Sequence, residues 1–401
     1  MEKITIFGEA DQPSLQQLVQ SAEKGDFAVL CADHHLGYSH PIGGAVAYEN
    51  HISPSGVGFD IACGNKAVMT NLKTKEVDTG RVMDDIQRLI SFGIGTRNKL
   101  KADHSVIEKI AHASFNPQRK LWQTAKEQLG TVGGGNHYVD IFDDENGNLW
   151  VGVHFGSRGF GFKTAMGFLA LAQGCDFTER VKEPSVNSPP VIFEVNSSMG
   201  LDYIEAMKLA GEYAYAGRDI VVETVLKLLG AKPIYEVHNH HNFAWHEEHF
   251  GKKYWVVRKG CTPAFPGQQG FVGANMEDYS VILEGIDSEL SKKALYSTVH
   301  GAGRVMSRRK AIGKTKWKKG NDGVRRQVVI QPGLIDYKSV VQRLSKKGIE
   351  LRGGAADEAP EAYKSLQAVL DKHEGTIKIL HWLKPVGVAM AGEGDVDPYK
   401  D

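Results

Sequence analysis

Four short segments of this sequence place histidine beside glycine or asparagine, and they lie far apart along the chain. They are GGGNH, ending in His137; HFGSRG, beginning at His154; HNHHN, residues 238–242; and HGAGR, beginning at His300. A fifth segment, GFDIACG, contains Asp60 and Cys63, three residues apart. Imidazole, thiolate and carboxylate are the side chains that bind transition metals, and glycine allows backbone to approach an ion or a phosphate. The pattern predicts one metal site built from several loops, with an anionic ligand close by.

Each segment taken alone has an ordinary structural explanation. Cys63 can be a small buried apolar residue and Asp60 a turn cap, and histidines are often half buried without a ligand. His240 and His241 are adjacent, so on an extended segment only one of them can face a given site. The metal site is favoured because five such segments occur in one chain.

His300 differs from the other histidines in its surroundings. Gly301 and Gly303 flank it closely, and Arg304 and a basic run follow. A neutral imidazole can attack a phosphorus atom while arginine balances the phosphate charge. The same residues fit one more metal ligand equally well, so both roles stay open on this pattern.

The basic run spans residues 304–326 and contains ten lysines or arginines against one acid, Asp322. Such a local excess can follow a phosphate backbone, and Trp317 within it could stack on a base. The alternative is a solvated, mobile loop without a ligand.

The bulk composition is that of an ordinary globular protein. The 401 residues include 48 basic and 48 acidic ones, so the net charge gives no argument for nucleic acid or membrane. We find no apolar run of membrane-spanning length, and the N-terminus lacks the pattern of a signal peptide, so we expect a cytoplasmic protein without a membrane partner. The four cysteines are not closely spaced, which favours free thiols or a ligand over disulfides.

Strand and helix patterns alternate along the chain. We expect strands at 3–7, 27–31, 149–154, 254–257, 328–330 and 377–388, and helices at 14–24, 82–92, 120–129, 202–229 and 357–371. The candidate ligands extend from residue 60 to residue 300, so independent domains would separate them. We therefore expect one large α/β (α+β) domain over residues 1–401 around a central cleft, with a mainly helical excursion at about 160–230.

Taken together, the segments resemble those of the RtcB-type RNA-splicing ligases. The matching motifs run in order from about residue 28 to 390: DHHLGYSHPIGG, GVGFDIACG, GGGNH, HFGSRG, HHN, RKG, GQQG, HGAGRVMSR, EAYK and LKPVGV. HGAGRVMSR together with DIACG is highly specific. The resemblance implies a GTP- and manganese-dependent ligase that joins RNA 2′,3′-cyclic-phosphate or 3′-phosphate ends to 5′-hydroxyl ends, in tRNA splicing or RNA repair. Its partners would be tRNA halves or cleaved RNA, and an activator protein is also possible in this family.

The resemblance also implies roles for individual residues. Two Mn²⁺ ions that share Cys63 would be held by Asp60, Cys63, His137, His154 and His241. His300 would be the catalytic nucleophile that takes GMP, and Arg158 and Arg304 would hold RNA-end phosphates. The nucleotide would contact Asn136, Asp140, Asn242, Gly273, Ala274, Asn275, Met276, Ser280, Gly301, Ala302, Gly303, Tyr363 and Met390.

The chain departs from the family pattern where the base would bind. Met390 stands where the family usually has a lysine that meets guanine, and Asp140 replaces a glutamate. In the segment GANME, Asn275 replaces a serine and Glu277 replaces a glycine. These differences predict intact catalysis with a weaker preference for guanine. Two alternatives remain: a dinuclear metal phosphoesterase that acts on RNA ends without nucleotide transfer, and an inactive paralogue that binds RNA ends.

Overall fold

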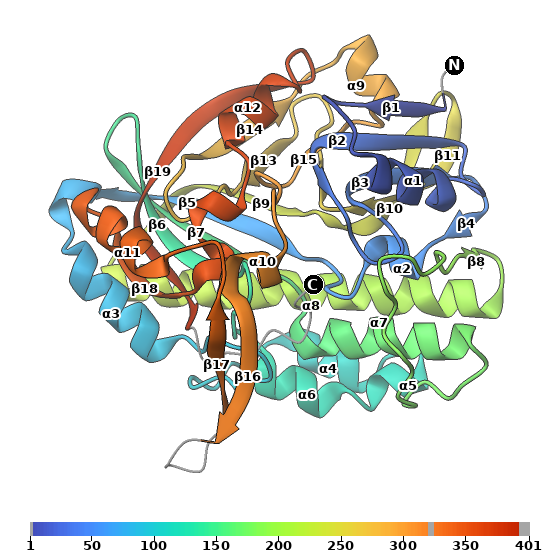
Figure 1. Cartoon of the computed structure of the whole chain (residues 1–401). Coiled ribbons are helices and arrows are strands. Elements are labelled where there is room, and N and C mark those ends of the chain that lie inside the picture. The colour runs from blue at the N-terminus through green and yellow to red at the C-terminus, as the bar shows by residue number, and fades with distance from the viewer. Residues whose placement is uncertain (1–2, 320–324, 393–401) are drawn as a thin grey trace.

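A computed structural model describes residues 3–319 and 325–392 of the chain, apart from the side chains of residues 317 and 325–327 (Figure 1). The helices are α1 (Gln12–Ser21), α2 (Pro54–Val57), α3 (Thr79–Leu89), α4 (Ser105–Ala111), α5 (Asn116–Arg119), α6 (Trp122–Gln128), α7 (Arg158–Ala172), α8 (Ser198–Leu229), α9 (Glu289–Lys293), α10 (Arg308–Ile312), α11 (Tyr337–Lys346) and α12 (Leu366–Asp371). Short 3₁₀ turns occur at Thr74–Glu76, Ala356–Glu358 and Pro360–Ala362.

The strands form two main sheets and several small pairs. They are β1 (Ile4–Ile6), β2 (Phe27–His35), β3 (Ile42–Tyr48), β4 (His51–Ile52), β5 (Gly64–Lys73), β6 (Tyr138–Asp144), β7 (Asn148–Phe155), β8 (Phe193–Glu194), β9 (Pro233–His240), β10 (Asn242–His249), β11 (Lys252–Lys259), β12 (Cys261–Pro263), β13 (Gln269–Val272), β14 (Ser280–Gly285), β15 (Ser297–Val299), β16 (Gly313–Lys319), β17 (Arg325–Pro332), β18 (Glu350–Gly354) and β19 (Ile377–Gly392).

The larger sheet has the strand order β13-β14-β19-β6-β7-β5-β9, with β18 beside β19, and the smaller sheet has the order β1-β2-β3-β11-β10. Helices α7 and α8 run alongside each other below the sheets in Figure 1. Helix α8 supports the larger sheet, because Val221 and Val225 pack in one buried cluster with Val151 and Val153 of β7. Apolar burial of this kind holds the helical layer against the strands that carry the candidate ligands.

Helix α8 illustrates why the elements begin and end where they do. The Ser197 hydroxyl accepts a hydrogen bond from the Gly200 amide, which caps the N-terminus four residues earlier than the apolar spacing predicts. At the other end, Gly230 adopts a left-handed conformation with φ of 63°. Glycine adopts this conformation without the strain that a β-carbon would cause, so the predicted helix end at Gly230 is confirmed.

The predicted α/β class and the predicted strands are confirmed, and most observed strands are longer than expected. The helix predicted at 357–371 is wrong over its first half, where two 3₁₀ turns precede α12. Pro360 disfavours helical conformation at Ala359, which is extended with ψ of 151°. The helical excursion at 160–230 is interrupted as well, because residues 173–197 contain three prolines and only the short strand β8. Within the described ranges, no helix is both long and apolar enough to cross a membrane.

Candidate metal and nucleotide site

The candidate site lies where the two main sheets meet. Strand β9 belongs to the larger sheet and β10 to the smaller one, and His241 is the single residue between them. Cys63 ends the tight turn before β5. The His241 amide donates to the Cys63 carbonyl at 2.8 Å, and the Ala62 amide donates to the Asn242 carbonyl at 2.7 Å. These backbone bonds tie the GFDIACG turn to the crossing between the sheets.

A cavity of about 1240 Å³ opens at this junction. Every residue that the sequence nominated for metal, nucleotide or RNA phosphate lines it. The structure therefore brings together segments that are up to 330 positions apart, from Asp60 to Met390.

Cys63, His137 and His154 form a compact donor set, whose ligand atoms all lie within 4.8 Å of one another. Cys63 Sγ is 3.6 Å from Nε2 of His137 and 3.6 Å from Nε2 of His154. Asp60 Oδ2 is 3.1 Å from His137 Nε2. With metal–sulfur and metal–nitrogen bonds of about 2.3 and 2.1 Å, two ligands of one tetrahedral ion lie about 3.6 Å apart. The donor set therefore fits a transition-metal ion held by soft and borderline ligands.

The imidazoles of His154 and His241 are oriented for ligation. His154 Nδ1 lies 2.5 Å from Asn65 Oδ1; since an amide oxygen only accepts, Nδ1 carries the proton and Nε2 is left for an ion. The His241 ring is 5.1 Å from the His154 ring, and its buried Nδ1 has no hydrogen-bond partner in the described structure. Burial lowers the pKa of both histidines well below the usual value, so both present neutral rings. A bound cation would satisfy the orphaned nitrogen of His241.

Burial also raises the pKa of the Cys63 thiol well above its usual value, and the Asp60 charge adds to the effect. A cation that binds Cys63 must therefore displace the thiol proton. The turn that carries Cys63 is held by Arg218, a fully buried residue of α8 that donates to the carbonyls of Ala62 and Phe155 at 3.1 and 2.6 Å. Arg218 also contacts His240 Nδ1 at 2.9 Å. Of the adjacent pair, His241 faces the donor set and His240 serves the framework, as the extended segment predicts.

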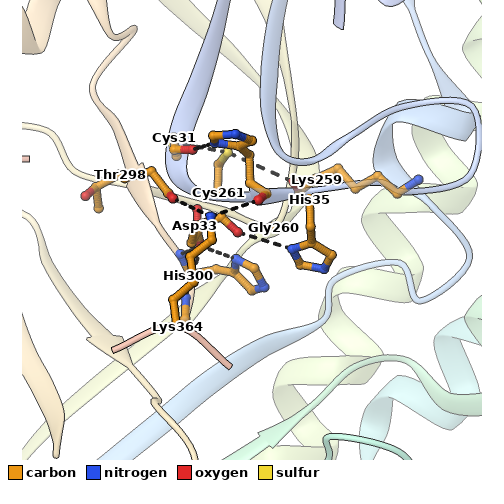
Figure 2. A network of polar contacts seen from close by, with 12 residues as sticks. Cys31, Asp33, His35, Lys259, Gly260, Cys261, Thr298, His300 and Lys364 are labelled. Atoms are coloured by element: carbon orange, nitrogen blue, oxygen red, sulfur yellow. Dashed lines mark hydrogen bonds and ion pairs between the residues drawn. The ribbon is translucent and has the colours of Figure 1, made fainter. Parts of the chain in front are cut away.

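His300 lies beside the donor set, with its ring 4.9 Å from that of His241. Asp33 Oδ2 is 2.7 Å from His300 Nδ1 and accepts hydrogen bonds from the amides of His300 and Gly301 at 3.0 and 3.3 Å (Figure 2). Burial alone would raise the pKa of Asp33, but its pairing with the His300 ring and the hydrogen bond from the His300 amide lower it, which keeps the carboxylate ionised. An ionised carboxylate only accepts, so it holds the proton on Nδ1 and leaves the Nε2 lone pair free.

Space for the His300 ring depends on Gly260 of the RKG segment. Gly260 has φ of 63°, and a β-carbon there would come within 2.9 Å of the imidazole. Its amide donates to Asn242 Oδ1 at 2.7 Å, which also orients that side chain beside the cavity. A larger residue at position 260 would be strained and would displace the ring.

The end of the cavity around Met276 and Met390 is largely apolar. Met276, Met390 and Val388 are buried there in a cluster that includes residues of α11. Two polar groups interrupt this apolar surface. Asp140 Oδ1 and the Tyr138 hydroxyl are buried there without hydrogen-bond partners in the described structure. Burial raises the pKa of Asp140 well above its usual value, which favours the neutral carboxyl group, a form that can both donate and accept.

Several residues nominated for the nucleotide or RNA already have protein partners. Asn275 Oδ1 accepts from the amides of Glu277 and Asp278, both at 2.9 Å, which forms a turn rather than a free acceptor. Ser280 accepts from the Ala274 amide at 3.2 Å.

The two nominated arginines also contact the protein. Arg304 donates to the Tyr363 hydroxyl at 3.0 Å and to the Asp357 carbonyl at 2.8 Å, and its guanidinium lies 5.0 Å from the centre of the Tyr363 ring. Arg158 reaches His137 Nδ1 at 3.5 Å. Both arginines keep their charge on the cavity wall.

Where it is described, the basic run forms regular secondary structure and not the irregular loop of the alternative interpretation. It forms α10 and β16, and the hairpin β16–β17 extends away from the body of the molecule (Figure 1). Arg308 pairs with Asp357 and Glu358 at the cavity rim, while Lys314, Lys316, Lys318 and Lys319 are exposed. The side chain of Trp317 lies outside the described residues.

Sequence reasoning missed three supporting residues: Asp33, Asn65 and Arg218. Asp33 lies in the conspicuous DHHLG segment, and Asn65 follows Cys63 by two positions, so both had a local indication. Arg218 lies in the middle of a helix, and its spacing gives no indication of its contact with two strands.

Comparison with known proteins identifies the family of the chain. The family described as tRNA-splicing ligase RtcB matches residues 17–391. A tRNA-splicing ligase RtcB of Archaeoglobus fulgidus is 30% identical over 90% of this chain and 87% of its own length. The RNA-splicing ligase RtcB of Escherichia coli K12 is 29% identical over 92% of both chains. RNA-splicing ligase RtcB homolog 1 of Entamoeba dispar is 30% identical over 88% of this chain and 77% of its own. The chain therefore belongs to the RtcB family of RNA ligases.

Proposed function

We propose that this protein joins RNA ends that carry a 2′,3′-cyclic phosphate or 3′-phosphate to 5′-hydroxyl ends, using GTP and two Mn²⁺ ions, through a covalent His300–GMP intermediate. The substrates would be tRNA halves or cleaved RNA in the cytoplasm. The observation that carries the proposal is the Asp33–His300 pair, with its contact of 2.7 Å, beside the Cys63, His137 and His154 donor set.

The protein groups support a nucleophilic first step. Asp33 holds the proton on His300 Nδ1, so Nε2 attacks the α-phosphorus of GTP and pyrophosphate leaves. The resulting imidazolium is stabilised by the Asp33 carboxylate. An oxygen of the RNA 3′-phosphate then attacks the same phosphorus, which breaks the P–N bond and restores His300. Finally the 5′-hydroxyl oxygen attacks the 3′-phosphorus, releases GMP and loses its proton. A cyclic phosphate would first be hydrolysed to the 3′-phosphate.

The ions would be held by Asp60, Cys63, His137, His154 and His241, in two sets of ligands that share Cys63. Bound there, they would offset negative charge on the reacting phosphates. The protein contributes the fixed ligand positions, with Asn65 and Arg218 behind them. Asn136 and Asn242 would donate to nucleotide phosphates from the cavity wall, beside the backbone of Gly301, Ala302 and Gly303.

For the base we propose a weaker preference for guanine than is usual in the family. Met390 cannot donate a hydrogen bond, and Asn275 uses its oxygen within its own turn. Asp140 remains as a buried group with an unpartnered oxygen, and its neutral carboxyl can pair with more than one base edge. Tyr363, Met276, Gly273, Ala274 and Ser280 would enclose the base without reading it strongly.

The RNA outside the cavity would follow the exposed lysines of β16 and the rim cation Lys310. These lysines belong to the basic run of the sequence and lie on the two-stranded ribbon β16–β17, where alternate side chains of a strand share a face. Neutralising phosphates in this way makes affinity depend on salt.

Incubation of the protein with GTP, Mn²⁺, a 3′-phosphate RNA and a 5′-hydroxyl RNA tests the proposal. We expect joined RNA, with one GMP and one pyrophosphate released per junction. A phosphoesterase would remove or open the terminal phosphate without joining, and an inactive end-binding protein would do neither; each of these results would contradict the proposal.

A further inference from the structure

The imidazole of His35 lies at the cavity beside Asp33 and has no part in the steps of the proposed function. His35 is the last residue of β2, is half-buried and lines the cavity. Its Nδ1 is 3.1 Å from the backbone carbonyl oxygen of Asp33. Because a carbonyl oxygen only accepts, Nδ1 carries the proton and Nε2 keeps its lone pair. His35 therefore offers a proton acceptor to a group bound in the cavity.

A single residue, Asp33, orients two imidazoles in this way. Its carboxylate contacts His300 Nδ1 at 2.7 Å, its carbonyl contacts His35 Nδ1, and Figure 2 shows both rings beside it. The adjacent His34 differs, because its Nδ1 donates to the Cys31 carbonyl at 2.7 Å and its Nε2 accepts from the Asp11 amide at 3.3 Å. His34 thus uses both ring nitrogens in the framework, whereas His35 keeps Nε2 for a ligand.

Of the three attacks in the proposed function, only the last requires removal of a proton from the nucleophile. His300 attacks through a nitrogen that carries no proton. The attacking oxygen of the RNA 3′-phosphate is already ionised, because the second pKa of a phosphate monoester is about 6. The 5′-hydroxyl oxygen carries a proton that must leave as its bond to phosphorus forms. The joining step therefore needs a proton acceptor near the 3′-phosphate.

The surroundings of His35 connect it with that phosphate. Burial lowers the pKa of His35 to about 4, and the neighbouring His300 and Arg304 act in the same direction, so the ring is neutral at neutral pH. An RNA 3′-phosphate held at Arg304 brings negative charge close to the imidazole. Nearby negative charge favours the imidazolium, so the bound phosphate raises the pKa of His35 toward the range of an effective base.

We propose that His35 is the general base of the joining step, an inference that rests on the proposed function. Nε2 takes the proton of the 5′-hydroxyl group while the hydroxyl oxygen forms a bond to the 3′-phosphorus. The bond from that phosphorus to the bridging oxygen of GMP breaks, and its electron pair leaves with GMP. The His35 imidazolium then returns its proton to water.

RNA that already carries GMP on its 3′-phosphate isolates the joining step. With this RNA and a 5′-hydroxyl RNA, His35→Ala should join the ends roughly a hundredfold to ten-thousandfold more slowly than wild type, the range typical of a lost general base. Labelling of His300 by GTP and transfer of GMP to a 3′-phosphate RNA should stay close to the wild-type rates. These two earlier steps also show that the variant is folded.

A 5′-thiol end distinguishes a base from a residue that only shapes the cavity. Above its pKa of roughly 8.5 a thiol is mostly ionised and needs no proton acceptor. At such a pH, His35→Ala should join a 5′-thiol RNA as fast as wild type does, while its joining of the 5′-hydroxyl RNA stays slow.

His51→Ala is the matched control, because His51 is a half-buried histidine that does not line the cavity, and it should join both kinds of end like wild type. Wild-type joining of the 5′-hydroxyl RNA by His35→Ala would overturn the assignment, as would equal slowing with the hydroxyl and the thiol. Failure of the wild type itself to take GMP from GTP would instead count against the proposed ligase, so the two failures are distinguishable.

Discussion

The two ends of the cavity differ in how far protein partners orient the side chains that would do the chemistry. At the metal end, His154 is paired with Asn65, His300 with Asp33, and the Cys63 turn is bonded by Arg218. At the base end, Met276 and Met390 are buried around Asp140, which has an unpartnered oxygen. Groups with defined partners have defined orientations, which catalysis by attack on phosphorus requires. The contrast indicates that the chemistry is tightly specified and the choice of base is not.

The largest effect should follow loss of the shared ligand. Cys63→Ala should remove ligation and lower the bound metal, because one thiolate serves both proposed ligand sets. Elemental analysis of the bound metal checks this prediction, with Cys175→Ala, a cysteine outside the cavity, as the control. Full occupancy in Cys63→Ala would show that Cys63 is not a bridging ligand.

The next effect concerns the carboxylate behind the nucleophile. Asp33→Ala should slow nucleotide labelling of His300 by roughly a hundredfold to ten-thousandfold, because the proton on Nδ1 loses its acceptor and the imidazolium loses its counter-charge. Labelling should be slowed less in Asp33→Asn, since its amide oxygen can still accept the hydrogen bond from Nδ1. Single-turnover labelling measures both rates. Equal rates in wild type and Asp33→Ala would remove Asp33 from the mechanism.

Asn65 should have a smaller effect through His154. Asn65→Ala should weaken metal binding by roughly tenfold to a hundredfold, as is typical when the partner of a ligand histidine is lost. Asn65→Asp keeps an acceptor oxygen and is the matched control. Titration with Mn²⁺ gives the affinities, and an unchanged value for Asn65→Ala would mean that His154 needs no such support.

The smallest effect should appear at the base end. Met390→Lys should raise the preference for GTP over ATP by about tenfold, because an ammonium can donate to guanine O6 or N7 and a thioether cannot. Met390→Leu keeps the apolar volume and should change little. Competition between GTP and ATP in the labelling assay measures this preference. A strong preference of the wild type for GTP that Met390→Lys leaves unchanged would show that another residue reads the base.

Sequence patterns predicted the metal end better than the elements that support it. Each candidate ligand lies in a short segment that contains glycine or asparagine, so residue types alone nominated Asp60, Cys63 and the histidines. Their convergence depends on β9 and β10 crossing between two sheets, which no local pattern encodes. Arg218 was missed because its partners, the carbonyls of Ala62 and Phe155 and the His240 ring, are distant from it in the sequence. The helix predicted at 357–371 was wrong over its first half, because local apolar spacing was outweighed by the backbone restriction that Pro360 imposes.

The central claim is that His300 carries the nucleotide, and one measurement tests it most directly. Wild type and His300→Ala are incubated with GTP labelled at the α-phosphate and Mn²⁺, denatured, and analysed by gel and by peptide mass spectrometry. We predict one GMP per chain on His300, with the bond labile to acid, and no label in His300→Ala at near wild-type metal content. A covalent adduct that persists in His300→Ala, or no adduct in the wild type, would contradict the account.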